Sequence, residues 1–170
     1  MQNVWIIIWR FSPLHIWHIS LINKSIKSKN KTLVIIWSAN KIDEKNPYTI
    51  KERLEILKKE FWDKILLRYI DDYEEDESWI NYLNNIILSE NISKEDFLYF
   101  LWWDIKNDYA IKIIKQYQES FKYRNIFFDE KPRNEIPISA TKIRQLLKEN
   151  NKREIKKWLS EKTTYLIIKK

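Results

Sequence analysis

The chain has 170 residues and no glycine. A typical chain of this length contains about 12 glycines, and finding none by chance has a probability on the order of 10⁻⁵. Glycine is used where the backbone takes a positive φ or where another group must approach the main chain closely. The same chain contains nine tryptophans. We therefore predict that many of the tryptophans stand where the fold requires glycine.

Short apolar runs alternate along the chain with segments whose apolar residues recur at helical spacing. Strands are expected at residues 3–8, 32–36, 65–70, 96–101 and 125–128. Helices are expected at residues 16–27, 49–57, 78–88, 107–118, 140–148, 152–159 and 163–168. Thr49 and Glu52 form a capping box at the start of the second helix. This alternation predicts an α/β fold, a Rossmann-like doubly wound parallel sheet of about five strands with C-terminal helices, in a single domain over residues 1–170.

Composition limits the partners of such a domain. The net charge of +7 suits nucleic acid, an acidic membrane surface or phosphorylated small molecules. A basic nucleic-acid-binding domain is one interpretation, but no stacking or groove-reading motif accompanies the charge, so we expect no nucleic-acid partner. The absence of cysteine excludes disulfides and thiolate chemistry. The apolar run at residues 4–8 is too short to cross a bilayer, and we expect a cytoplasmic protein without a membrane partner.

Four tryptophans fall at the predicted ligand-binding edge of the sheet, and a fifth lies at the start of the first helix. Trp9 and Trp37 follow the first two strands, Trp102 and Trp103 follow the fourth, and Trp17 begins the first helix. In a doubly wound sheet ligands bind beyond the carboxyl ends of the strands, where glycine lets phosphate approach the backbone. Aromatic residues lining a ligand pocket would be an alternative, but that alternative leaves the absent glycines unexplained.

Two short motifs point to a family. The stretch WRFSPLHIWH, residues 9–18, contains both histidines of the chain. With glycine for Trp9 and Trp17 it reads GRFSPLHIGH and resembles the phosphate-binding signature G-x-F-x-P-x-H-x-G-H of the nucleotidyltransferase superfamily that includes nicotinamide-nucleotide adenylyltransferases. The stretch ISATKIR, residues 138–144, is similar to the I-S-x-T-x-[IV]-R signature of the same superfamily. The two motifs lie at the expected ends of one α/β domain.

A third segment narrows the resemblance. WSANKIDEKNPYTIKER, residues 37–53, resembles the G-S-A-x…N-P-F-T-x-x-E-R stretch of archaeal-type nicotinamide mononucleotide (NMN) adenylyltransferases and of the related domain fused to Nudix hydrolases. Asp72 and Trp79 match an aspartate and a tryptophan seven residues apart in that subfamily. Trp79 is therefore expected to be a true tryptophan, as is Trp158, which lies in a helix that needs no glycine.

The resemblance implies adenylyl transfer from ATP to NMN, giving NAD⁺ and pyrophosphate. The resemblance also implies that ATP and NMN are the partners and that the protein is a homo-oligomer. Mg²⁺ is expected as the cofactor, bound by the phosphates, and no residue is assigned as its ligand. His15 and His18 share one face at a helix start, where free N–H groups and the helix dipole favour anions. The resemblance implies that they hold the triphosphate, and that Arg10 and Arg144 neutralise it.

Further residues are carried over from the same resemblance. The residues expected to bind ATP are Trp9, Phe11, Trp17, Trp102, Trp103, Asp104, Ser139 and Thr141. The residues expected to bind the mononucleotide are Ser38, Asn40, Arg53, Asp72 and Trp79. Within this second group Arg53 would bind the phosphate, Asp72 would contact the substrate, and Trp79 would stack on the nicotinamide ring.

Structural roles stay open for three of these residues. Ser139 is placed to cap its helix, Arg53 is placed to pair with Glu52 or Glu55 on a helix surface, and Trp79 fits the core face of an amphipathic helix. The acidic run at residues 71–77, DDYEEDE, is expected to be a solvated loop rather than a metal site.

The tryptophans separate two functional interpretations. As written, Trp17 would place an indole where the family packs nucleotide against bare backbone, and Trp9 would crowd the phosphates. A gene that uses UGA codons for glycine, translated with a table in which UGA means tryptophan, would produce this pattern. The residues that would then be glycine are Trp5, Trp9, Trp17, Trp37, Trp62, Trp102 and Trp103. If the tryptophans are real, a catalytically dead nucleotide-binding module is the alternative; a pantetheine or flavin phosphate is the alternative acceptor.

Overall fold

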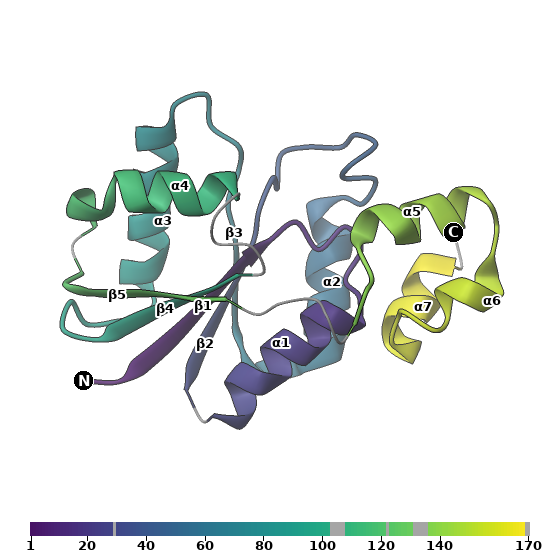
Figure 1. Cartoon of the computed structure of the whole chain (residues 1–170), viewed down its shortest axis with the longest axis horizontal. Helices are drawn as coiled ribbons and strands as arrows, with labels where there is room; N and C mark the ends of the chain where they lie inside the picture. Colours follow the sequence, from purple (N-terminus) through teal and green to yellow (C-terminus); the bar gives the residue numbers. More distant parts are fainter. Residues whose placement is uncertain (29, 103–107, 122, 131–135, 169–170) are drawn as a thin grey trace.

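The predicted strands form one parallel sheet. The computed structural model describes all residues except 29, 103–107, 122, 131–135 and 169–170 (Figure 1). The strands are β1 (Asn3–Trp9), β2 (Lys31–Ile36), β3 (Leu66–Tyr69), β4 (Phe97–Trp102) and β5 (Asn125–Glu130). They lie in the order β3-β2-β1-β4-β5, and every neighbouring pair is parallel. This confirms the predicted α/β fold, and the reversal of strand order on either side of β1 places its carboxyl end at the switch point where such sheets bind ligands.

Helices cover both faces of this sheet. The helices are α1 (Ile16–Lys27), α2 (Ile50–Phe61), α3 (Asp76–Ser89), α4 (Tyr109–Gln116), α5 (Ala140–Lys148), α6 (Lys152–Ile155) and α7 (Glu161–Ile168). Two single-turn 3-10 helices, η1 (Trp62–Lys64) and η2 (Gln118–Ser120), follow α2 and α4. No helix among the described residues is both long enough and apolar enough to cross a membrane.

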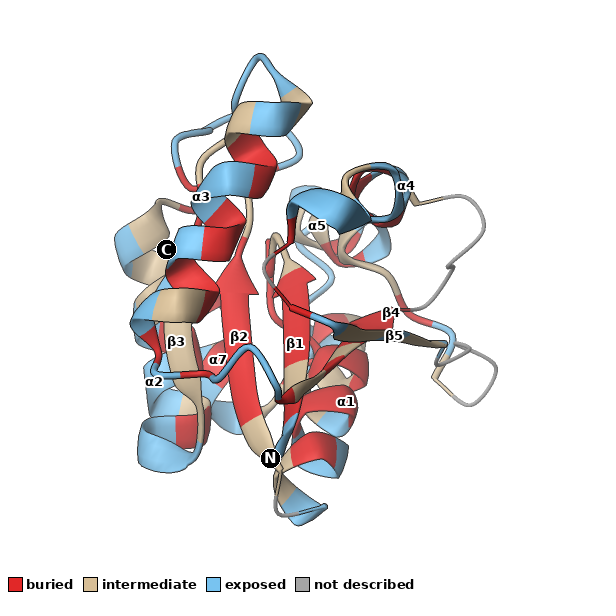
Figure 2. Ribbon diagram, turned by 90° about the vertical axis from the view of Figure 1, so that its left-hand side faces the viewer, coloured by how far each residue is buried: buried red, intermediate tan, exposed pale blue. Residues whose placement is uncertain are grey.

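Two apolar cores lie on opposite sides of β1. Val4, Ile6 and Ile8 pack with α3 and α4, whereas Ile7 packs with α1, α2 and the C-terminal helices. Figure 2 shows β1 and β2 largely buried between these layers. Because both faces of the sheet are covered, these strands read as nearly continuous apolar runs rather than as alternating ones.

The helix boundaries follow mostly from local capping. Thr49 accepts a hydrogen bond from the backbone N–H of Glu52 (3.3 Å), and the Glu52 carboxylate accepts from the N–H of Thr49 (2.7 Å), which confirms the capping box. The predicted helix at 152–159 is too long, since α6 ends at Ile155. The N–H groups of Lys157 and Trp158 bond to carbonyls three residues back (3.1 and 2.9 Å) instead of four, so the α-helical pattern stops there. The carbonyl of Trp158 accepts from the N–H of Ile16 (3.0 Å) and so satisfies the start of α1.

Positive φ angles occur here without glycine. They are found at Phe11, Ser38, Trp62, Asn91 and Asn150. Asn91 and Asn150 directly follow the C-caps of α3 and α5, where the short polar side chain of asparagine tolerates the left-handed conformation. None of Trp9, Trp17, Trp37 and Trp102 has a positive φ. The backbone conformation at these four positions therefore does not require glycine. The remaining reason to expect glycine there is the space that a ligand would need.

Trp62, after α2, is the exception among the tryptophans. Its φ of 50° and ψ of −122° are those of the first central residue of a type II′ turn, a position dominated by glycine. A bulky residue held there is strained by about 1–3 kcal/mol. The side chain is 78% exposed, so burial offsets little of that cost.

Candidate active site

A cavity of about 1040 Å³ opens at the carboxyl edge of the sheet. Trp9 at the end of β1, Trp37 after β2 and Trp102 at the end of β4 line one side of it. The first turns of α1, α3, α4 and α5 converge on the same space. This is the place where doubly wound sheets bind their ligands, and four helix N-termini make it favourable for anions.

The cavity gathers most of the predicted site residues. Those that line it are Trp9, Arg10, Phe11, His15, His18, Asp72, Trp79, Trp102, Ser139, Thr141 and Arg144. Four others do not line it: Trp17, Ser38, Asn40 and Arg53. Trp103 and Asp104 lie outside the described residues.

The two histidines stack on each other at the start of α1. Their ring centroids are 3.8 Å apart with 27° between the ring planes, and both side chains are buried. His15 is the N-cap residue in an extended conformation, and its side chain makes no capping hydrogen bond to the helix. The pair therefore forms a preorganised wall of imidazole groups beside the helix N-terminus, at the place where a phosphate chain would lie.

Arg144 connects the two signature motifs. Its guanidinium donates to the carbonyl of Ser12 (2.8 Å) and to the hydroxyl of Thr141 (3.1 Å). Ser139 caps α5 by accepting from the N–H of Lys142 (3.2 Å), which confirms the capping role of its hydroxyl while the residue also lines the cavity. Burial and the charge of Arg10 lower the pKa of Arg144. An anion placed between the two arginines would relieve this repulsion.

Ser38 and Asn40 do not line the cavity but hydrogen-bond to residues that do. The Ser38 hydroxyl donates to the carboxylate of Asp72 (2.9 Å) and accepts from Nε of Arg10 (3.2 Å). The Asn40 side chain exchanges hydrogen bonds with the backbone of Asp72, at 3.0 and 3.3 Å. The guanidinium of Arg10 lies over the Trp37 ring, 5.5 Å from its centroid. Through these contacts the loop after β2 fixes the positions of Arg10 and Asp72, one cation and one anion of the cavity.

Arg53 is fully buried below the same loop. Its exposed fraction is 0%, so the predicted surface pair with Glu52 or Glu55 is wrong. The guanidinium donates to the main-chain carbonyls of residues 10, 37 and 38 at 3.1, 2.9 and 2.8 Å. Burial and the charge of Arg10 lower its pKa. Arg53 thus joins the segments that follow β1 and β2, and its role as a phosphate ligand stays a prediction.

Three tryptophans fill one volume beside the histidines. The Trp9 indole stacks on Trp102 (4.8 Å between centroids, 22° between planes) and meets the edge of Trp17 (5.2 Å, 69°). It also lies 5.6 Å from the ring of His18. Trp17 itself packs in the core with α1, so it is Trp9 rather than Trp17 that stands in the cavity wall. Glycine at these positions would remove the three indoles and widen the space beside the histidines.

Trp79 is both a core residue and a cavity residue. It packs in the core on α3, 5.6 Å from the ring of Trp37, and lines the cavity. Its indole Nε1–H is buried and has no hydrogen-bond partner among the described residues. Both predicted roles are therefore compatible with the structure.

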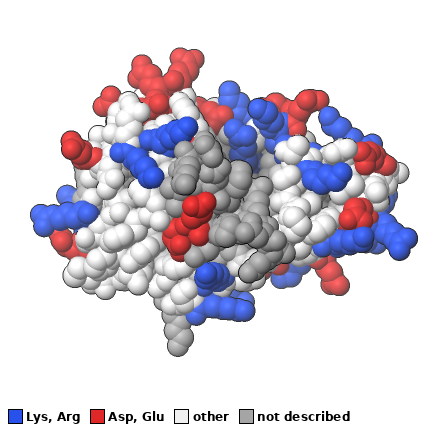
Figure 3. Space-filling view, in the orientation of Figure 1, with Lys and Arg blue, Asp and Glu red and all other residues white. Residues whose placement is uncertain are grey.

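The cavity is also lined by charged residues that the sequence analysis did not predict as site residues. Lys45 and Lys148 line it with Arg10 and Arg144, and Lys148 forms an ion pair with Glu44 across its mouth (3.2 Å). Figure 3 shows basic side chains gathered near the top centre of the molecule and acidic ones at the upper left. Lys45 lies within residues 37–53, the segment that resembles the family, and it follows a strand. Its position in the sequence could therefore have predicted that it belongs to the site. Lys148 has no such signal, since only the tertiary fold brings α5 to this edge.

Acidic residues line the part of the cavity near α3 and α4. They are Asp72, Asp76 and Asp108. Asp76 accepts a hydrogen bond from the hydroxyl of Tyr109 (2.9 Å), which links the first turns of the two helices. Residues 71–75 form a loop that is half-buried to exposed, as expected for a solvated loop, whereas Asp76 is the first residue of α3. Within the described chain, no three His, Cys, Asp or Glu side chains gather as a metal site.

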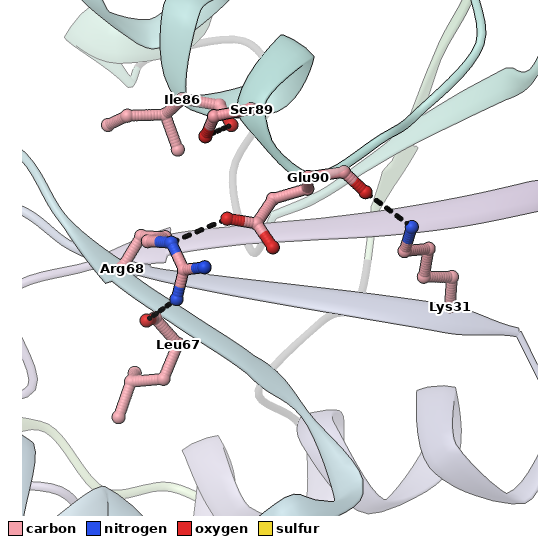
Figure 4. A network of polar contacts seen from close by, with 6 residues as sticks. All are labelled: Lys31, Leu67, Arg68, Ile86, Ser89 and Glu90. Carbon is pink, nitrogen blue, oxygen red and sulfur yellow. Dashed lines mark hydrogen bonds and ion pairs between the residues drawn. The ribbon is translucent and has the colours of Figure 1, made fainter.

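The far end of α3 is anchored to the sheet (Figure 4). The buried carboxylate of Glu90, the C-cap of α3, pairs with Arg68 of β3 (2.5 Å). The Glu90 carbonyl accepts from Nζ of Lys31 on β2 (2.6 Å). This anchor fixes the helix that carries Asp76 and Trp79 into the cavity at its opposite end.

The architecture is shared with known nucleotide-handling enzymes. A bifunctional NMN adenylyltransferase/ADP ribose pyrophosphatase from Francisella tularensis, crystallised with AMP and a Mn ion, superposes with a TM-score of 0.65 at 18% identity over 95% of this chain and 44% of its own. A NadR protein in complex with NAD and AMP-PNP gives 0.69 at 21% identity over 88% of this chain and 43% of its own. This chain thus spans less than half the length of both proteins.

A third relative has a length close to that of this chain. The nicotinic acid mononucleotide adenylyltransferase of Plasmodium falciparum gives a TM-score of 0.61 at 16% identity over 99% of this chain and 96% of its own. No curated protein matches the sequence significantly. The family model described as cytidylyltransferase-like matches residues 7–146, which include both signature motifs. The chain therefore belongs to the cytidylyltransferase-like family.

Proposed function

We propose that this protein transfers the adenylyl group of ATP to NMN, forming NAD⁺ and pyrophosphate. The observation that carries the proposal is the meeting of the two motifs in one cavity, where His15 and His18 face the same space as Arg144 and Arg10. Structural relatives named for NMN and nicotinic acid mononucleotide adenylyltransferase activity support it. A phosphorylated pantetheine or flavin as acceptor is the second candidate.

The reaction needs positioning more than covalent catalysis. A phosphate oxygen of NMN attacks the α-phosphorus of ATP, the bond to the bridging oxygen breaks, and pyrophosphate leaves with that electron pair. His15 and His18 would donate hydrogen bonds to the phosphate chain, while Arg10 and Arg144 would offset the charge that develops on it. Among the described residues no three His, Cys, Asp or Glu side chains gather as a metal site, so Mg²⁺ would be held mainly by the substrate phosphates and would neutralise part of their charge.

The charge near Trp79 favours the amide form of the mononucleotide. Asp76 lies one helical turn before Trp79 on the same face of α3, and Asp72 lines the same part of the cavity. The pyridinium ring of NMN is cationic and would be attracted by these carboxylates. The acid form adds a carboxylate to that ring and would be repelled.

The proposed activity rests on glycine at seven positions of the native protein. These positions are Trp5, Trp9, Trp17, Trp37, Trp62, Trp102 and Trp103. Two observations support the substitution: the turn conformation of Trp62, which favours glycine, and the indole cluster of Trp9, Trp17 and Trp102 beside the histidines.

Peptide mass spectrometry of the protein from its native cell is expected to read glycine at residues 17 and 62. The same spectra should read tryptophan at residues 79 and 158, which serve as internal controls because neither position needs glycine. Tryptophan at residue 17 would refute the recoding. The catalytically dead nucleotide-binding module would then become the better interpretation.

The activity itself is tested with two recombinant forms, the printed chain and the glycine form with glycine at all seven positions. Pyrophosphate release is measured with ATP and a panel of acceptors: NMN, its acid form, pantetheine phosphate and flavin mononucleotide. We expect the glycine form to prefer NMN, and the printed chain to have a kcat/KM lower by roughly 100-fold or more, because its indoles displace the phosphates from the histidines. Preference for another acceptor would overturn the NMN assignment, and ATP binding without turnover would overturn the enzyme.

A further inference from the structure

Among the described residues, the outer edge of β5 has no neighbouring strand. β5 is last in the sheet order and pairs with β4 alone among the described strands. Its six residues, NIFFDE, include neither proline nor lysine, the residues that commonly protect an exposed edge. Unpaired backbone N–H and C=O groups along such an edge favour pairing with another strand.

An aromatic strip leads to this edge. Phe97 and Tyr99 of β4 lie two residues apart and so share one face of the sheet. Tyr99 is the register partner of Phe127 on β5, and the two rings stack at 5.0 Å with 19° between their planes. Phe127 also lies 6.2 Å from Phe97, and it remains 43% exposed. The strip therefore ends at the open edge with an uncovered aromatic side chain.

The two ends of β5 carry opposite charges. Arg124 directly precedes the strand and its side chain is 80% exposed, while Glu130 is the exposed last residue. If two copies pair antiparallel with Phe127 facing Phe127, Arg124 lies opposite Glu130, because one is three residues before the centre and the other three after it. A twofold axis then produces two such opposite-charge pairs, and each is favourable across neighbouring strands.

We propose that the chain forms a twofold dimer through antiparallel pairing of β5 with β5 of a second copy, centred on Phe127. The backbone groups of both edges become hydrogen-bonded, and the aromatic strips of the two copies meet. The proposal is independent of the adenylyl transfer, because none of its residues lines the cavity. Among the glycine positions that the structure describes, only residue 5 adjoins the strip, since the Trp5 ring lies 6.2 Å from that of Tyr99.

The test measures the dissociation constant of the dimer by sedimentation or light scattering over a concentration series of the full chain. Arg124→Glu and Glu130→Arg are each expected to raise it about tenfold or more, since each variant creates two like-charge pairs. Lys59→Glu on α2 is the matched control: it makes the same charge change and also breaks an exposed ion pair, Lys59 with Glu55 (2.8 Å), as Arg124→Glu does with Glu95.

Mixing the two single variants in equal amounts is expected to restore association, because in the mixed dimer both cross-strand pairs again have opposite charges. Circular dichroism confirms that each variant is folded. A parent chain that stays monomeric at every concentration would overturn the dimer. A dimer unaffected by both variants would overturn this interface, and a mixture that stays dissociated would overturn the antiparallel register.

Discussion

His18→Ala is expected to lower kcat for NAD⁺ synthesis in the glycine form by about 10²- to 10³-fold. His18 lies buried at the first turn of α1, stacked on His15 and facing the cavity. A preorganised donor in a site shielded from water stabilises developing phosphate charge far more than water does, and removing one such donor has effects of this size. The measurement is the initial rate of pyrophosphate release at saturating ATP and NMN.

The conservative variant His18→Asn separates chemistry from packing. Asparagine keeps an N–H donor in a smaller side chain, so it should retain more of the rate than alanine does. Thermal unfolding of both variants checks that any loss of rate is not a loss of fold. An alanine variant with full kcat and a lowered unfolding temperature would mean that the histidine serves only the core.

Arg53→Ala is expected to lower the free energy of unfolding by about 3 kcal/mol or more. The change leaves the carbonyls of residues 10 and 37 without the guanidinium donor, while the Ser38 carbonyl keeps the N–H of Lys41. Each carbonyl left unsatisfied costs about 1 kcal/mol or more, and the loss of the large buried side chain adds to this. Since the whole stability of a domain is only about 5–15 kcal/mol, this loss is a large fraction of it. Urea unfolding followed by circular dichroism measures the effect.

Arg53→Lys is the informative companion to that variant. Lysine reaches fewer of the three carbonyls and should lose only part of the stability. If Arg53 instead binds the phosphate of NMN, the lysine variant would keep its stability and raise KM for NMN. A loss of stability with an unchanged KM would indicate the positioning role. A raised KM with unchanged stability would indicate the predicted ligand role.

Local sequence patterns predicted the helices and strands, because these depend mainly on residues that are close together in the sequence. The apolar runs gave five strands, and the pair Thr49 and Glu52 marked the start of α2 because capping acts over three residues. The site could be located because residues that directly follow strands meet at one edge of a parallel sheet. Trp9 and Trp102 were both expected at this edge, and both line the cavity there.

Features that depend on distant segments could not be predicted in this way. The periodicity of α2 places Arg53 on the helix but does not reveal that the loop after β2 covers it. Lys148 and Asp76 reach the cavity only through the packing of α5 and α3. The contact between the Trp158 carbonyl and the N–H of Ile16 likewise joins segments from opposite ends of the chain, and no local pattern predicts it.

The clamp made by Arg53 has an evolutionary consequence. The guanidinium binds main-chain carbonyls, which are present whatever side chains stand at residues 10, 37 and 38. Exchange of tryptophan for glycine at residue 37 therefore leaves the joint between β1 and β2 in place. The fold can therefore be conserved in evolution while the side chains that line the cavity change. Proteins with this fold can in this way acquire new acceptor substrates.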